Sequence, residues 1–170
     1  MAFEIEFYSS EDGREPVAEF LDSLDSKMSA KLVGLMEILE EKGTELRMPY
    51  SKHLEDGIFE LRCKQGSNIT KGANMNLKEY KTKKMNDPEF AKAYEEIQPE
   101  MNVIRAIIDA RISQNMTQKE LAERTGIAQT EISKLENGTR NPSIKLLQRL
   151  AEGMDMVLNI SFTPKASVRK

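Results

Sequence analysis

The chain has 170 residues, 39% of them hydrophobic, and a formal net charge of −3, which allows one ordinary domain or two small ones. Because the chain is acidic overall, any binding to nucleic acid must come from a local basic patch. No apolar run is long enough to span a membrane and no basic-then-apolar leader opens the sequence, so we expect a cytoplasmic protein without a membrane partner. Cys63 is the only cysteine and His53 the only histidine, which excludes an internal disulfide and a cysteine-based metal cage. We expect no metal and no cofactor.

The first seventy residues predict a strand, two helices and a second strand. Alternating apolar side chains indicate strands at residues 3–8 and 58–64. Pro16 opens a short helix, and Asp25 caps a longer helix that Gly43 ends. Both helices present an apolar face that needs a sheet to cover it.

This order, together with EIEFYSSEDGREPVAEFLDSL near the start and HLEDGIFELR later, resembles the amino-terminal part of the RelE/HigB-like toxin family, in the phage-derived branch called Gp49-like. The resemblance covers residues 2–69. Toxins of this family are small ribosome-dependent mRNA endonucleases, with a curved antiparallel sheet backed by two helices. In the family, further strands and a basic stretch follow the strand that matches residues 58–64, whereas here GSNIT runs directly into KGANMNLKEYK.

We therefore expect residues 1–70 to be a truncated toxin segment without enzymatic activity. Metal-free RNA cleavage needs a positioned acid and base with several cations around the phosphate. A solvated sheet edge is the simpler explanation of the nearby candidates, which are Lys52, His53, Arg62 and Lys64. We assign no catalytic residue. The alternative is an mRNA interferase, a ribosome-dependent endoribonuclease silenced by its fused antitoxin.

A junction follows at residues 71–98, which we interpret as a linker and the first helices of a second unit. The letters MNLKEY at residues 75–80 look like the start of a separate reading frame. Asp87 then caps a helix, and Pro99 leads into the next unit, which opens with a packing helix at residues 101–114.

Two short helices joined by a tight turn are predicted from Thr117 onward. Thr117 and Glu120 form a capping box at the start of the first helix. Gly126 supplies the positive φ that lets the chain reverse, so we expect the second helix to begin near Ala128.

The second helix separates apolar from polar side chains. Ile132 and Leu135 share one face, which we expect to be buried. The opposite face carries amides, hydroxyls and a lysine, which suit the DNA major groove because glutamine can pair with adenine and lysine with guanine. These polar residues are Gln129, Thr130, Ser133 and Lys134. An ordinary helical hairpin with a solvated face is the simpler alternative.

The stretches TQKELA, TGIAQTEISKLENG and RNPS closely resemble the Xre/Cro-like helix-turn-helix family of phage repressors, over residues 101–153. The resemblance implies that Gln118 and Asn137 bind phosphate and that the polar face of the second helix reads bases. Arg140 follows the motif in a loop, where we expect a contact to the DNA backbone. The expected DNA-binding residues are thus Gln118, Gln129, Thr130, Ser133, Lys134, Asn137 and Arg140.

The rest of this unit is expected to complete a helical domain. The family often pairs an arginine of the preceding helix with the glutamate of LENG, so we expect Arg111 and Glu136 to form a structural pair. Residues 144–152 predict another helix. Alternation in residues 154–163 predicts a strand, whose open edge would pair with the same strand of a second subunit or with a sheet elsewhere.

The expected fold class is α+β: a partial RelE-like segment at residues 1–70, then a lambda-repressor-like helix-turn-helix domain with a terminal strand at residues 99–164. A toxin gene lying just ahead of an Xre-type antitoxin gene is the arrangement of HigBA-like toxin–antitoxin modules. We therefore predict a dimeric HigA-type antitoxin and transcriptional repressor that reads a double-stranded operator with residues 129–137. A cognate RelE/HigB-like toxin is a possible partner. A protein-interaction module without either activity is a further alternative.

Overall fold

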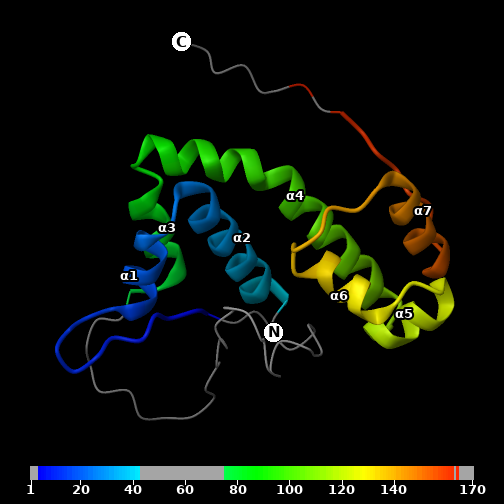
Figure 1. Cartoon of the computed structure of the whole chain (residues 1–170), viewed down its shortest axis with the longest axis horizontal. Helices are drawn as coiled ribbons and strands as arrows, with labels where there is room; N and C mark the ends of the chain where they lie inside the picture. Colours follow the sequence, from blue (N-terminus) through cyan, green and yellow to red (C-terminus); the bar gives the residue numbers. More distant parts are fainter. Residues whose placement is uncertain (1–3, 43–74, 163, 165–170) are drawn as a thin grey trace.

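The structure is a computed structural model, which describes residues 4–42, 75–162 and 164. Within those residues the chain is helical (Figure 1). The helices are α1 (Pro16–Ser23), α2 (Ser26–Lys42), α3 (Leu77–Lys84), α4 (Pro88–Ser113), α5 (Gln118–Thr125), α6 (Gln129–Glu136) and α7 (Ile144–Gly153). None of the described helices is both long and apolar enough to cross a membrane.

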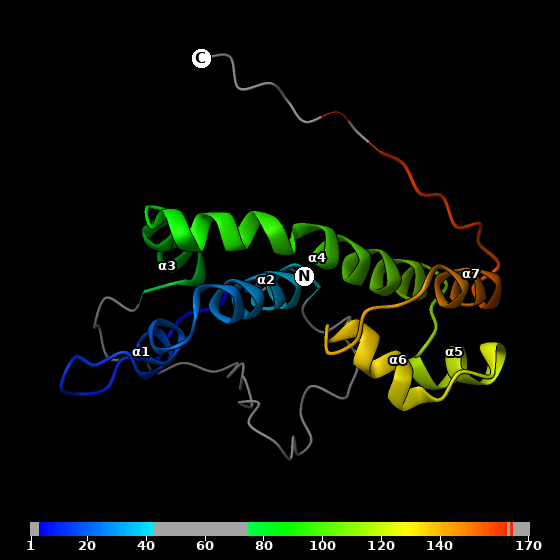
Figure 2. The same ribbon diagram turned by 45° about the horizontal axis from the view of Figure 1, so that its top comes forward.

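Helix α4 joins two groups of helices. In both views α1, α2 and α3 lie along its first part, and α5, α6 and α7 lie around its last turns (Figures 1 and 2). Each group has its own apolar core, and α4 contributes to both: Ile104 and Ile108 pack in the first core and Ile107 in the second. The spacing of these residues places them on neighbouring faces of one helix. Both groups of helices therefore pack on the same helix, α4.

A separate packing helix was predicted at residues 101–114, and that prediction was wrong, because α4 begins at Pro88 and has Pro99 inside it. Asp87 caps the helix as expected, because its carboxylate accepts a hydrogen bond from the Glu89 N–H at 2.9 Å. A proline inside a helix removes one hydrogen bond and costs about 3 kcal/mol. Pro99 is on the exposed side of α4, while Ile97 and Met101 on either side of it are buried against the first core. Packing of the buried face, which carries Ile97 and Met101, keeps the helix continuous.

Helix α2 packs closely along the first part of α4. Gly34 allows this approach, because a Cβ atom at that position would lie 2.9 Å from the Met101 Sδ and 3.1 Å from the Ile97 Cδ1. Ion pairs flank the contact: Lys31 Nζ lies 2.8 Å from Glu100 Oε1, and the Arg105 and Lys42 side chains pair with Glu41 and Asp109. The segment before residue 43 is thus docked on the helix that leads into the second unit.

The predicted strand at residues 3–8 is reduced to an isolated antiparallel bridge between Glu6 and Asn76. The Phe7 N–H donates to the Met75 carbonyl at 2.9 Å, and the Leu77 N–H donates to the Ile5 carbonyl at 3.0 Å. The bridge does not continue past Asn76, because Asn76 caps α3, whose first turn begins at the next residue. The predicted strand at residues 58–64, with Cys63, Arg62 and Lys64, lies outside the described residues, as do Lys52 and His53.

The predicted terminal strand at residues 154–163 is not confirmed, and neither is the α+β class. Residues 155–162 leave α7 and extend away from the helices without forming a strand (Figures 1 and 2). Val157 and Phe162 are 93% and 98% exposed. A strand needs a partner edge for its backbone hydrogen bonds. No described residue of the same chain provides a partner edge here, so the segment with alternating apolar side chains does not form a strand.

Candidate nucleic-acid interface

Helices α5 and α6 form the predicted helix-turn-helix. The Glu120 backbone N–H donates to the Thr117 hydroxyl at 3.2 Å, and the Thr117 N–H and hydroxyl donate back to the Glu120 carboxylate at 2.7 and 2.8 Å. The two bonds that Thr117 donates to the carboxylate, first that of its backbone N–H and then that of its hydroxyl, lower the pKa of Glu120 below its ordinary value. Gly126 has φ +65°, and α6 begins at Gln129 after the Ala128 cap. The predicted capping box and turn are confirmed.

The two helices are held by the second apolar core. Leu121 of α5 and Ile132 of α6 are fully buried, and Leu135 and Leu150 are 1% exposed. Arg149 of α7 donates from its Nε to the Thr125 carbonyl at 2.8 Å, which satisfies a free carbonyl at the end of α5. The predicted inward face of α6 is confirmed. Its opposite face is consequently turned outward.

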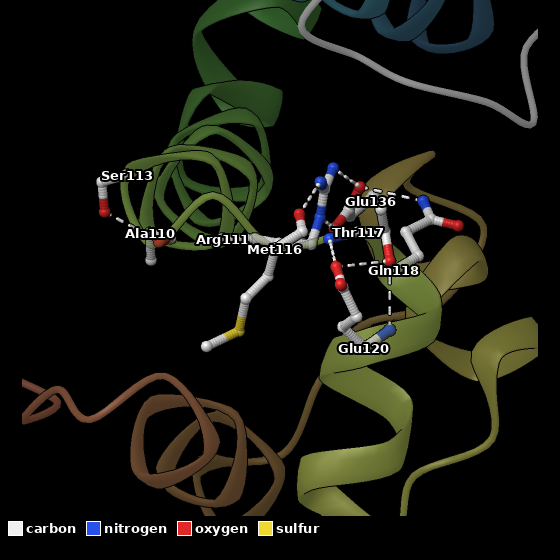
Figure 3. Close-up of polar contacts among 8 residues, drawn as sticks. All are labelled: Ala110, Arg111, Ser113, Met116, Thr117, Gln118, Glu120 and Glu136. Atoms are coloured by element: carbon white, nitrogen blue, oxygen red, sulfur yellow. Dashed lines mark hydrogen bonds and ion pairs between the residues drawn. The ribbon is translucent and has the colours of Figure 1, made fainter.

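A buried ion pair fixes α6 against α4 (Figure 3). The Arg111 guanidinium donates from Nε and Nη2 to the two Glu136 carboxylate oxygens, at 2.7 and 2.8 Å, and from Nη1 to the Met116 carbonyl at 2.9 Å. The two side chains are 2% and 0% exposed. Bidentate geometry fixes both the distance and the orientation of the partners. The prediction that this pair is structural is confirmed, since neither side chain reaches the surface.

Gln118 also points toward this pair rather than outward (Figure 3). Its side chain is buried, and its Nε2 donates to the Glu136 Oε2 at 2.9 Å. The Oε1 atom is buried and has no hydrogen-bond partner within the described part of the chain. A phosphate contact from this side chain stays a prediction, and it would require the amide to leave Glu136. The structure therefore separates Gln118 from the outward face of α6.

Four predicted base-reading residues share the outward side of α6. Gln129, Thr130 and Lys134 are exposed, and Ser133 is half-buried. Lys134 lies with its Nζ 3.2 Å from the Glu131 Oε1 and keeps a side-chain exposure of 55%. Amide, hydroxyl and ammonium groups on an accessible helix face can donate to and accept from base edges in a major groove. The structure thus brings these four residues together.

Asn137 and Arg140 lie just beyond the end of α6. The Asn137 Oδ1 accepts hydrogen bonds from the Thr139 hydroxyl at 2.9 Å and from the Thr139 N–H at 3.4 Å, which leaves the Asn137 amide nitrogen as a donor. Arg140 is exposed, and its Nη1 pairs with the Glu131 Oε2. Both predicted phosphate-binding side chains therefore flank the outward face of α6 with donors available.

Glu131 was not predicted to be a functional residue. The spacing of Glu131 and Lys134 on a helix would have indicated their contact. The contact with Arg140 crosses the turn at Gly138, whose φ is +70°, and no local sequence pattern indicates it. Glu131 consequently partners two of the residues expected to bind DNA.

Comparisons with known proteins agree with this geometry. Residues 107–157 match the family model described as Helix-turn-helix, and residues 19–73 match the one described as Phage derived protein Gp49-like. The chain is 41% identical over 56 residues to a protein of Sinorhizobium fredii named as an uncharacterized HTH-type transcriptional regulator, y4dL. That match covers 33% of this chain and only 28% of the relative. No solved structure matches the chain significantly.

The second half of the chain thus contains a helix-turn-helix domain of the class found in DNA-binding regulators. The first half contains a Gp49-like segment, a kind of segment associated with toxin–antitoxin systems. The Gp49-like match includes the end of α1 and all of α2. The structure packs α2 on α4, so the described part of the Gp49-like match lies on the helix that leads into the helix-turn-helix match.

Proposed function

We propose that the chain is a sequence-specific transcriptional repressor of the HigA antitoxin type, which reads the major groove of a double-stranded DNA operator with α6. The observation that carries the proposal is the outward polar face of α6, with Gln129, Thr130 and Lys134 exposed above a fully buried Ile132. The Arg111–Glu136 pair supports it, because a helix that reads bases must be held rigidly. A duplex of the DNA upstream of the chain's own coding sequence is the first probe to test.

Base readout and backbone contact are expected to respond differently to substitution. Changing Gln129 or Lys134 to alanine should weaken binding to the preferred duplex by about 1–3 kcal/mol and relax sequence preference. Changing Asn137 to alanine should weaken binding to all duplexes about equally, because phosphates carry no sequence information. Gel shifts with operator variants and an unrelated duplex measure both effects.

Gln148, which is exposed on α7, gives a matched control, since Gln148→Ala removes the same amide away from α6. Gln118 is a poor test of phosphate binding, because its buried bond to Glu136 makes the variant a stability change as well. Unchanged binding of Gln129→Ala to every operator variant would show that α6 does not read bases at this position.

We further propose that the regulator is a homodimer that pairs through the segment predicted as a strand at residues 154–163, with residues 157–162 at the contact. One helix-turn-helix unit buries little DNA surface, and dimers bind half-sites about 34–36 Å apart. The exposed Val157, Ile160 and Phe162 would be covered by a second copy. Pairing with the same segment of a second copy would also supply the partner edge that residues 157–162 lack among the described residues.

A chain ending at Met156 is expected to be a folded monomer with weak operator binding. Truncation before Met154 is unsuitable, because Met154 is 3% exposed and belongs to the second core. Analytical ultracentrifugation of the full chain and of the shortened chain measures the difference, and Val157→Ser with Phe162→Ser in the full chain should reproduce it. A shortened chain that is still dimeric would move the interface elsewhere.

The proposed role within a toxin–antitoxin module rests on the Gp49-like segment alone, and a cognate RelE/HigB-like toxin is the proposed partner. We propose that the segment here serves the regulator as a structural part and has no nuclease activity. The support is the packing of α2, whose buried Ala30, Val33 and Met36 belong to the same core as Ile97 and Met101 of α4. An apolar face that is already covered by α4 does not need the sheet of a complete toxin.

A further inference from the structure

One carboxylate contacts two of the cations expected at the DNA surface. Glu131 lies in the first turn of α6, and its Oε1 is 3.2 Å from the Lys134 Nζ, while its Oε2 pairs with the Arg140 Nη1. The Glu131 side chain is 27% exposed, whereas those of Lys134 and Arg140 are 55% and 53% exposed. The anion thus lies beneath two outward-facing cations that belong to different parts of the chain.

The loop that carries Arg140 is folded back onto α6. The Thr139 N–H donates to the Lys134 carbonyl at 3.0 Å, and the Arg140 N–H donates to the same carbonyl at 3.2 Å. Behind the turn, a Cβ atom on Gly138 would lie 3.0 Å from the Ile104 Cδ1. Helix α4 therefore lies close to the turn that precedes Arg140.

Exposed ion pairs usually contribute little to the free energy of unfolding, and we expect the same of this cluster. Its position matters because a guanidinium has five N–H donors in a rigid fork. The contact with Glu131 engages Nη1 of Arg140, so donors on the remaining guanidinium nitrogens can still reach a phosphate. With two cations and one anion, the cluster keeps a net positive charge on the surface.

We propose that Glu131 is a positioning residue that fixes the Arg140 guanidinium relative to Lys134, and so couples a DNA backbone contact to base readout by α6. The proposal rests on the proposed function. At the preferred operator, Arg140 reaches its phosphate already oriented while Lys134 meets its base. On unrelated DNA, the carboxylate repels phosphates that approach out of this register. Glu131 thereby raises discrimination, which a merely structural residue would not do.

The test is Glu131→Gln in the full chain, with binding measured on a duplex from upstream of its own coding sequence and on an unrelated duplex of equal length. Binding to the upstream duplex should weaken about five- to tenfold, while binding to the unrelated duplex should stay equal or tighten. The salt dependence on the upstream duplex should become shallower by about 0.9 in the logarithmic slope, the value of one phosphate contact.

Two comparisons make the result specific. Glu96→Gln makes the same charge change on an exposed part of α4 and should leave the ratio between the two duplexes unchanged. Arg140→Ala should weaken operator binding in the native chain. In a chain that already carries Glu131→Gln it should cause little further loss of binding, because the positioned contact is already lost. Thermal melting by circular dichroism should differ little among these variants.

The outcomes separate the two proposals. If the native chain shows no preference for the upstream duplex over the unrelated one, the proposed sequence-specific reading of an operator in that duplex fails. If the native chain shows that preference but Glu131→Gln tightens both duplexes by the same factor, the positioning role is wrong and Glu131 is only a repulsive charge. Additive losses for Glu131→Gln and Arg140→Ala would also overturn the coupling.

Discussion

Replacing Arg111 with methionine is expected to lower the free energy of unfolding by about 3–5 kcal/mol, the cost of breaking a buried ion pair by removing one partner. Glu136 is fully buried, and without the guanidinium it would keep, among the described residues, only the side-chain bond from Gln118. The Met116 carbonyl would also lose its donor. Urea denaturation followed by far-ultraviolet circular dichroism measures the loss.

Arg124→Met is the matched control, because Arg124 and Asp155 form a pair at 3.2 Å whose side chains are 53% and 82% exposed. That variant should lose less than about 1 kcal/mol. Arg111→Met combined with Glu136→Leu should recover part of the loss, since no unpaired charge would then stay buried. Equal losses for Arg111→Met and Arg124→Met would contradict the structural role of the buried pair.

Replacing Met101 with alanine is expected to lower the free energy of unfolding by about 2–5 kcal/mol, because it leaves a cavity in the first core. Met101 is fully buried and meets α2 at Gly34. Amide hydrogen exchange should show faster exchange in α2 and α4 together, and also in α5 to α7, since α4 belongs to both cores.

Met85→Ala removes the same side chain at a position that is 36% exposed and should have a much smaller effect. Faster exchange confined to α2 in Met101→Ala would show that the two groups of helices unfold independently. Uniform loss of protection across both groups would show that they unfold as one unit.

Local signals made the helix-turn-helix predictable. The capping box of Thr117 and Glu120 and the glycine at residue 126 each act within a few residues, and the structure contains both. The inward face of α6 followed from the spacing of Ile132 and Leu135, because helical periodicity alone decides which side chains share a face. These features depend on no distant part of the chain.

Other features depend on contacts between distant residues, and the sequence did not reveal them. Pro99 is a helix breaker by local rules, yet packing of Ile97 and Met101 against the first core keeps α4 continuous. The alternation in residues 154–163 is typical of a strand, but a strand also needs a partner edge. The phosphate contact expected of Gln118 stays a prediction, but the inward direction of its side chain follows from Glu136, eighteen residues later, which no local pattern indicates.

The continuity of α4 also constrains how the length of this chain can change. An α-helix has 3.6 residues per turn, so inserting one residue turns everything beyond it by about 100°. An insertion between Ile97 and Ile107 would rotate the helix-turn-helix around the axis on which the Gp49-like helices are docked. An insertion of about seven residues, close to two turns, would restore the orientation of the helix-turn-helix about the α4 axis. It would also move the two groups of helices about 10 Å further apart along that axis. Gene variants in this stretch should therefore differ by substitution far more often than by length.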